Sequence, residues 1–332
     1  MSILKKILLL TTGGTIASTT SDMGLAPTVS GDGLIAQLGC AADYDITVRD
    51  LLTLDSSNIQ PEEWQLIARA IFEERKSYNG IVITHGTDTM AYTASMLSFM
   101  LKNIDIPVVL TGSQLPISHP LSDAPDNLRT AFAMAASSVC GIFVAFDRKI
   151  LLGCRAAKVR TTGFDAFESV NLPIVGKVSS EGLVIRRELV PKTVGECTLM
   201  DKVDAKVTLI KLIPGLDPRL IEAAVGIGTK GIVLEAFGSG GLAFVRRDLI
   251  SAIGEAVKKG ISIVVCSQCL YERSDMTTYE VGRRALEQGV IPGSDMTSEA
   301  AVTKLMWALG NYNSPKEIAE IFSQNLVGEV TC

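Results

Sequence analysis

Short apolar runs alternate with longer amphipathic segments along the first half of the chain. Apolar runs bounded by turn residues predict buried strands, and longer segments whose apolar positions recur at helical spacing predict helices. Such an alternation is typical of parallel strands joined by helical crossovers, and therefore of an α/β domain. The predicted strands are Leu4–Leu10, Ile46–Leu52, Ile81–Thr84, Pro107–Leu110 and Ile142–Phe146, and the predicted helices are Pro61–Ser77, Thr89–Lys102 and Ala124–Ser138.

The alternation stops at residues 191–206, which include Pro191, Gly195 and several charged residues, and then resumes. The later predicted strands are Val207–Leu212, Gly231–Phe237 and Ile261–Val265, and the later helices are Leu249–Lys259, Thr278–Gln288, Ser298–Leu309 and Ser314–Phe322. With 332 residues the chain is long enough for two domains of roughly 150 residues each. We expect a larger N-terminal parallel-sheet domain with helices on both faces (residues 1–190), a linker (191–206) and a smaller C-terminal α/β domain (207–332).

Composition narrows the choice of partners and compartment. The 31 basic and 36 acidic residues give a net charge of −5 with no basic block, which argues against nucleic-acid binding. No uncharged apolar run is long enough to span a membrane, and Ile7–Leu10 is too short for the core of a signal peptide, so we expect no membrane association. The seven scattered cysteines, odd in number, favour a reducing compartment, and we expect a cytoplasmic protein.

Four clusters of small, hydroxyl-bearing and acidic residues follow the predicted strands of the first domain. In an open parallel sheet the carboxyl ends of the strands share one edge, where ligands bind. Any one such cluster is more often an ordinary turn or helix cap, but four at one edge favour a functional site. The clusters are Thr11–Thr15, Leu54–Ser57, His85–Thr89 and Thr111–Gln114.

Several kinds of chemistry are disfavoured by what these clusters lack. No phosphate-binding G-x-x-x-x-G-K-[ST] motif is present, and the glycine-rich segment Gly238–Ala243 is only a weak match to a dinucleotide-binding turn. His85 and His119 are the two histidines, too few for a metallohydrolase, and we interpret His85 as a buried structural residue. Cys266 and Cys269 form a C-x-x-C without further zinc ligands nearby, and we interpret them as two buried cysteines. A threonine nucleophile remains, activated by a lysine whose pKa is lowered by burial or by a second hydroxyl in contact with one.

Two long segments, Leu9–Ala17 and Gly80–Met90, resemble the signature segments of the bacterial asparaginase/glutaminase family. Within the family the chain is most similar to the type I, cytoplasmic L-asparaginases. This resemblance implies hydrolysis of L-asparagine to L-aspartate and ammonia without a cofactor, with room for a minor glutaminase activity, in a homotetramer or homodimer whose sites are completed by a neighbouring subunit. It continues through Asp55–Ser57, Thr111–Gln114, Gly163–Phe167, Gln268–Cys269 and Glu299–Leu305, and so covers almost the whole chain.

The resemblance also implies the catalytic residues. Thr15 matches the family's nucleophile, which attacks the side-chain amide and forms an acyl-enzyme. Thr87 matches the second catalytic threonine, and Lys158 matches the lysine that partners it; together they orient the water that releases the product. Asp88 matches the acid of this group, which also contacts the substrate's α-amino group.

The substrate-binding residues follow in the same way. The segment around Ser56 matches the part of the family site that holds the substrate's α-carboxylate and α-amino groups, and Ser113 matches the position whose backbone helps to hold the oxyanion. The implied substrate-binding set is Asp55, Ser56, Ser57, Thr87, Asp88 and Ser113.

One position departs from the family pattern. Family members usually carry an activating tyrosine in the loop after the nucleophile, and the matching residue here is Leu25. Another group, such as Tyr279, would then have to assist Thr15. The composition of residues 17–29 also predicts a mobile lid.

Two other functions stay open at the level of sequence. One is the ammonia-supplying component of a tRNA-dependent amidotransferase, which we expect less because those chains have an extra N-terminal domain whereas a strand is predicted here from Leu4. The other is a non-catalytic module that senses small amino acids, which would not need two threonines, an aspartate and a lysine together.

Overall fold

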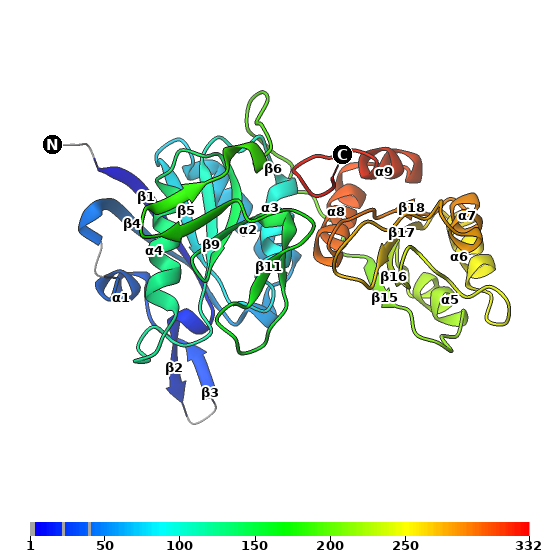
Figure 1. Cartoon of the computed structure of the whole chain (residues 1–332), viewed down its shortest axis with the longest axis horizontal. Helices are drawn as coiled ribbons and strands as arrows, with labels where there is room; N and C mark the ends of the chain where they lie inside the picture. Colours follow the sequence, from blue (N-terminus) through cyan, green and yellow to red (C-terminus); the bar gives the residue numbers. More distant parts are fainter. Residues whose placement is uncertain (1–3, 22–23, 39–40, 332) are drawn as a thin grey trace. The chain divides into compact units, whose positions relative to one another are not determined.

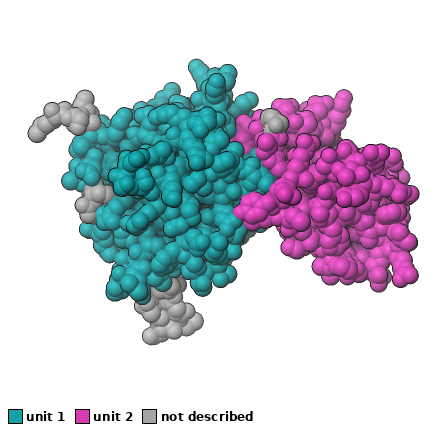
Figure 2. Space-filling view, in the orientation of Figure 1, with its two compact units in different colours: residues 1–201 teal, residues 202–332 magenta. Residues whose placement is uncertain are grey.

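The computed structural model describes residues 4–21, 24–38 and 41–331, without the side chains of residues 20–27 and 41. The chain forms two compact units, residues 1–201 and residues 202–332 (Figure 2). Each unit is an α/β structure with its own sheet, and each is described by itself (Figure 1).

The sheet of unit 1 has eight strands in the order β13-β12-β9-β8-β7-β5-β1-β4. Five neighbouring strands of this sheet are parallel, namely β8, β7, β5, β1 and β4. The other strands, β9, β12 and β13, complete the sheet in antiparallel pairing. The central strands are buried along their whole length, as expected for a sheet covered on both faces, whereas the edge strand β4 is half exposed. The strands are β1 (Lys5–Gly13), β4 (Tyr44–Leu54), β5 (Gly80–Thr84), β7 (Pro107–Thr111), β8 (Gly141–Phe146), β9 (Lys149–Leu152), β12 (Gly176–Ser179) and β13 (Gly182–Ile185).

Helices cover both faces of this sheet (Figure 1). The helix α3 packs against the sheet on one side and against α2 on the other, which explains why almost all of its residues are buried. The helix α4 packs against β5, β7 and β8 with an amphipathic surface. The α-helices in the described part of unit 1 are α1 (Gly31–Ala36), α2 (Pro61–Glu74), α3 (Met90–Met100) and α4 (Ala124–Ala135).

Several short elements of unit 1 were not predicted from the sequence. They include the hairpin β2–β3 (Ser18–Ser21 and Gly24–Pro27) and the pair β10–β11 (Ala156–Lys158 and Phe167–Ser169). Within the range interpreted as a linker, β14 (Thr198–Leu199) pairs with β6 (Leu101–Lys102) of unit 1. Strands this short carry too few apolar residues to give a periodic signal.

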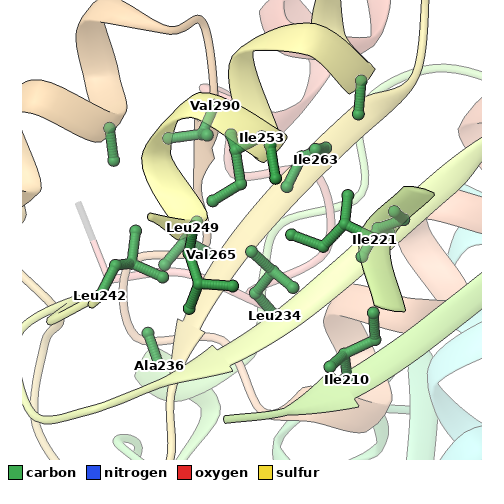
Figure 3. Close-up of a cluster of buried hydrophobic side chains, with 14 of the residues drawn as sticks. Ile210, Ile221, Leu234, Ala236, Leu242, Leu249, Ile253, Ile263, Val265 and Val290 are labelled. Atoms are coloured by element: carbon green, nitrogen blue, oxygen red, sulfur yellow. The ribbon is translucent and has the colours of Figure 1, made fainter. Parts of the chain in front are cut away.

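Unit 2 is built on a four-stranded parallel sheet in the order β15-β16-β17-β18. Side chains from β15, β16 and β17 meet side chains from α5, α6 and α7 in one apolar cluster, part of which is seen in Figure 3. The helix α8 packs against the same three strands. The elements are β15 (Val207–Lys211), α5 (Arg219–Gly226), β16 (Gly231–Ala236), α6 (Leu249–Lys258), β17 (Ser262–Ser267), α7 (Glu280–Glu287), β18 (Ile291–Pro292), α8 (Ser298–Asn311) and α9 (Pro315–Phe322).

The helices of the described residues are of the lengths found in globular domains, and none of them is long and apolar enough to cross a membrane.

Candidate active site

The four polar clusters lie at the carboxyl ends of β7, β5, β1 and β4, which are consecutive neighbours in the sheet. At the end of β1, Gly13 and Gly14 have φ angles of 100° and 82°, which residues other than glycine rarely adopt. A Cβ atom on Gly14 would lie 2.4 Å from the backbone nitrogen of Gly86. The absence of side chains at this turn therefore brings Thr15, the next residue, directly beside the loop that follows β5.

The loop after β4 joins the same contact. A Cβ atom on Gly86 would lie 2.5 Å from the Ser56 Oγ, and the Thr89 hydroxyl donates a hydrogen bond of 2.7 Å to the Ser56 carbonyl. A Cβ atom on Gly13 would lie 2.4 Å from the Leu54 carbonyl oxygen. The loops that carry Thr15, Ser56 and Thr87 therefore lie against one another, through the backbone of the glycines and the side chain of Ser56.

Lys158 joins the site from β10, far along the chain. Its ammonium nitrogen donates to the Thr87 Oγ1 at 2.8 Å and to the Asp88 Oδ1 at 2.5 Å. The Lys158 side chain is 17% exposed and the Asp88 side chain 65% exposed, so this contact lies at the mouth of the site. A lysine that bridges a threonine hydroxyl and a carboxylate can polarise the hydroxyl. The hydroxyl can still be reached by small molecules.

Asp55 and Ser57 form a compact polar turn around the buried Ser56. The Asp55 Oδ1 accepts hydrogen bonds from the Ser57 hydroxyl at 2.5 Å and from the Ser57 backbone N–H at 2.9 Å. These two bonds hold the pKa of the Asp55 carboxyl below its ordinary value, so the group is ionised at neutral pH. The turn thus presents a fixed negative charge at the same edge of the sheet.

Ser113 lies in the loop after β7, where a Cβ atom on Gly112 would meet the His85 carbonyl oxygen at 2.3 Å. Its own hydroxyl is turned inward and donates to the Leu115 carbonyl at 2.5 Å. The Asp123 carboxylate accepts from the backbone N–H groups of Gln114 and Leu115, at 3.0 and 3.1 Å. The loop after β7 is therefore held rigidly, and the Ser113 side chain serves the loop itself.

His85 is a buried structural residue, as the sequence indicated. Trp64 Nε1 donates to the Thr93 Oγ1 at 3.0 Å, and the Thr93 hydroxyl in turn contacts His85 Nε2 at 2.9 Å. The other ring nitrogen, Nδ1, then carries the proton and donates to the Gly86 carbonyl at 2.7 Å. Burial lowers the pKa of His85 to about 4, so a neutral imidazole fixes the Gly86 backbone.

Gln114 is a site residue whose role the sequence alone did not reveal. Its side-chain Oε1 lies 3.4 Å from the Thr87 Oγ1, while its Nε2 donates to the carbonyls of Thr161 and Gly163. The motif after β7 included Gln114, but its partners in the loop after β10 could not be foreseen from the spacing of residues.

Leu25 and Tyr279 are the two residues that the sequence connected with activation of Thr15. The Leu25 side chain lies outside the described residues, although the Leu25 backbone pairs with Thr20 in the hairpin β2–β3, which extends from the body of unit 1 (Figure 1). Tyr279 belongs to unit 2, where it precedes α7 and is 63% exposed.

The interpretation of Cys266 and Cys269 as two buried cysteines was wrong for one of them. Cys266 is buried, but Cys269 is exposed because it lies in the loop beyond the end of β17.

In the ranges that the structure describes, no group of three or more histidine, cysteine, aspartate or glutamate side chains could hold a metal ion. The described groups at the sheet edge include hydroxyls, carboxylates, the Lys158 ammonium, the Gln114 amide and backbone N–H groups.

Comparison with known families agrees with this arrangement. Residues 6–191 match the model described as "Asparaginase, N-terminal", and residues 206–322 match the "Glutaminase/Asparaginase C-terminal domain". Two matched models in this order cover most of the chain. The chain therefore belongs to the asparaginase/glutaminase family.

Individual relatives extend over the whole chain. An L-asparaginase of the archaeon Thermococcus kodakarensis is 48% identical over 98% of this chain and 99% of that protein, and its solved structure superposes with a TM-score of 0.93. L-asparaginase 1 of Escherichia coli is 36% identical, with 98% of both chains covered. A component of the glutamyl-tRNA(Gln) amidotransferase of Pyrococcus furiosus is 38% identical over 99% of this chain and 77% of that protein. The relatives thus include archaeal as well as bacterial proteins.

Proposed function

We propose that this protein is an L-asparaginase, which hydrolyses L-asparagine to L-aspartate and ammonia through a threonine nucleophile. The observation that carries the proposal is the Lys158 ammonium, which bridges Thr87 and Asp88 next to the glycine turn that precedes Thr15. The similarity to proteins named L-asparaginase over nearly the full length of both chains supports the same reaction.

In the proposed reaction the Thr15 hydroxyl attacks the side-chain amide carbon of asparagine. The proton of the hydroxyl passes to the amide nitrogen, which leaves as ammonia. The aspartyl group is then joined to Thr15 by an ester bond. Backbone N–H groups near Thr87 and Ser113 stabilise the oxyanion; loss of one such donor typically costs about a hundredfold or more in rate. Water oriented by Thr87 with Lys158 then hydrolyses the ester and frees Thr15.

Substrate binding in this scheme uses fixed charges on both sides of the site. The ionised carboxyl of Asp55 attracts the α-ammonium group of asparagine, and Asp88 contacts the same group. The hydroxyls and backbone N–H groups of Ser56 and Ser57 bind the α-carboxylate. No metal or cofactor takes part in any of these steps.

We further propose the subgroup, compartment, domains and assembly of the protein. Similarity to L-asparaginase 1 of Escherichia coli supports a type I enzyme, and seven scattered cysteines, odd in number, suit the reducing cytoplasm. Residues 1–190 would form the catalytic domain and 207–332 the smaller domain, joined by 191–206. Exposed apolar side chains of unit 2, namely Ile213, Phe237 and Val245, line one pocket and suit a contact within a homodimer or homotetramer. Light scattering on the purified protein measures the assembly.

The proposed function predicts that Thr15→Ala abolishes catalysis in the purified enzyme. Deleting an essential nucleophile commonly lowers kcat by about a thousandfold or more, since no covalent intermediate can form. Thr15→Ser keeps a hydroxyl and should retain measurable turnover. Ammonia release from L-asparagine measures both variants, and the melting temperature confirms that they are folded.

Two results would contradict the proposal in different ways. Near-normal ammonia release by Thr15→Ala would refute the assignment of Thr15 as the nucleophile. A wild-type protein that releases no ammonia from asparagine, in the absence of tRNA and any partner protein, would refute the function and favour the amidotransferase component.

A further inference from the structure

The side-chain amide of Gln114 lies between two different kinds of partner. On one side its Nε2 donates to the Thr161 carbonyl at 3.1 Å and to the Gly163 carbonyl at 3.0 Å. On the other side its Oε1 lies 3.4 Å from the Thr87 Oγ1. Carbonyl oxygens can only accept hydrogen bonds, so the NH₂ group must face Thr161 and Gly163. The chemistry of the partners therefore fixes the orientation of the amide, and Thr87 meets only an acceptor.

This orientation assigns the direction of the Thr87 proton. A threonine oxygen has one proton and two lone pairs. The proton points to the Gln114 Oε1, because that atom can only accept. One lone pair accepts from the Lys158 ammonium at 2.8 Å. A single lone pair of Thr87 is then left to accept a hydrogen bond from a molecule in the site.

Gln114 is itself held firmly enough to impose this direction. Its backbone N–H donates to the Asp123 carboxylate at 3.0 and 3.1 Å, and Asp123 also accepts from Asn127 Nδ2 at 3.0 Å. Asn127 Nδ2 in turn donates to the Gly112 carbonyl at 2.9 Å. The backbone that carries Gln114 is therefore anchored to the first turn of α4.

The loop that receives the Gln114 amide is also ordered by its own contacts. The Val159 N–H donates to the Ala166 carbonyl at 2.8 Å and closes the loop between β10 and β11. Across the loop, Arg160 forms ion pairs with Asp165 at 3.2 Å and with Glu168 at 2.9 Å. Gln114 thus connects Thr87 to a segment that starts one residue after Lys158.

We propose that Gln114 is a positioning residue for the hydrolytic step. By holding the Thr87 proton, it leaves the free lone pair of Thr87 to accept a hydrogen bond from the attacking water, which orients that water towards the ester. The proton of the water passes to the Thr15 oxygen as the ester bond breaks. The contact of 3.4 Å is long, and such contacts commonly shorten once substrate is bound. This inference rests on the proposed function, because it assigns a water-orienting task to Thr87.

The test compares three variants by steady-state hydrolysis of L-asparagine. Gln114→Met keeps the length of the side chain but neither donates nor accepts usefully. We expect kcat to fall about tenfold, the effect of one lost hydrogen bond of about 1.4 kcal/mol, while KM stays the same or falls. Gln65→Met is the matched control, because Gln65 is a half-buried glutamine of α2 that donates to the Asp201 carbonyl. It should leave kcat unchanged.

Gln114→Glu separates a positioning role from a merely structural one. When protonated, the introduced carboxyl can donate to a carbonyl and accept from Thr87, as glutamine does; when ionised, it repels the Thr161 and Gly163 carbonyls. Its kcat relative to wild type should therefore rise as the pH is lowered from about 8 to about 5. The same ratio for Gln114→Met should stay flat.

Each result decides the inference. An unchanged kcat in Gln114→Met, or a raised KM with unchanged kcat, overturns it. If Gln114→Met does not fold, the pH dependence of Gln114→Glu decides instead, and a flat ratio overturns the inference. A wild-type enzyme without asparaginase activity refutes the proposed function, which is a separate outcome from wild-type activity with an unaffected Gln114→Met.

Discussion

His85 lies at the end of β5 with both ring nitrogens engaged, between the Thr93 hydroxyl and the Gly86 carbonyl. The sequence suggested a structural histidine only because histidine is scarce in the chain and a relay would need more partners. The contacts add a reason: the ring fixes the carbonyl of Gly86, whose backbone touches Gly14. A neutral, fully buried imidazole thus supports the site by fixing its backbone.

The stability of the protein should fall in acid because of His85. Its pKa is about 4 in the folded protein and 6.5 when unfolded. Between these values the unfolded chain binds a proton that the folded chain does not, so stability is present above pH 6.5 and is lost as the pH falls towards 4. At about 1.4 kcal/mol per pH unit the loss is about 3 kcal/mol. Urea unfolding at a series of pH values from about 7 to about 4, which covers the two pKa values, measures this loss of stability.

Two variants isolate the contribution of this ring. His85→Gln remains neutral at every pH. It should therefore remove the contribution of His85 to the slope of the free energy of unfolding against pH. The control His119→Gln changes an exposed ring and should keep the wild-type slope. Equal slopes in wild type and His85→Gln would show that another group causes the acid sensitivity.

Single residues also show how far a sequence can define a site. The glycine turn and the cluster around Thr87 stand out because they follow buried strands, and the contact of Lys158 with Thr87 was expected from family resemblance. Gln114 was not assigned, since its role depends on two carbonyls about fifty residues away. Backbone acceptors have no sequence signal, so a residue that binds them is recognised only in the fold.

At the scale of elements, glycines at strand ends decide how closely the loops approach. The central strands of unit 1 were predicted to within a few residues because they are buried on both faces and apolar throughout. The antiparallel strands β9, β12 and β13 were not predicted, because strands of four residues are too short to give a clear periodic signal. The glycine turns at the strand ends allow a further test at this scale.

Gly14→Ala should be far more damaging than the same change at another glycine of positive φ. At Gly14 the φ angle is 82° and the new Cβ atom would lie 2.4 Å from the Gly86 nitrogen, so the loops must move apart. Gly182 has a φ angle of 89° but open space around it, so Gly182→Ala costs only the backbone strain of about 1–2 kcal/mol. We expect Gly14→Ala to exceed that cost and to reduce kcat as well.

Urea unfolding and asparagine hydrolysis measure both changes. Gly182 lies in the turn between β12 and β13, so its variant should keep the wild-type kcat. Equal stability losses in the two variants, with normal activity in both, would contradict the close approach of the loops after β1 and β5.

At the scale of the whole molecule, each unit has an apolar core of its own, and the core of unit 2 lies between its sheet and α5, α6 and α7 (Figure 3). Two α/β units were expected from the interrupted alternation of strands and helices. The short pairing of β14 with β6 could not be expected, because two-residue strands carry no pattern. All described residues of the proposed catalytic set lie in unit 1, so changes confined to unit 2 test how it is stabilised in its own right.

The final segment of unit 2 is held by a buried ion pair. The Lys304 ammonium, on α8, donates to the Glu329 Oε1 at 2.5 Å and to the Gln324 carbonyl at 2.9 Å, and both charged side chains are 0% exposed. Glu329 also accepts from the backbone N–H groups of Leu326 and Val327. Removing one partner of such a pair leaves a buried charge without its counterion, which typically costs about 3–5 kcal/mol.

Lys304→Met should therefore destabilise unit 2 by about that amount, while Lys316→Met should cost at most about 1 kcal/mol. Lys316 is the matched control because its ion pair with Glu320 on α9 is long, at 3.9 Å, and largely exposed. Replacing both buried partners, as Lys304→Met with Glu329→Gln, should recover part of the loss, since an amide oxygen can still accept from the backbone and no buried charge is left. Hydrogen exchange of the α8 and α9 amides, together with urea unfolding, measures the effect. If Lys304→Met exchanged no faster than Lys316→Met, the buried pair would not be what holds the C-terminal segment against α8.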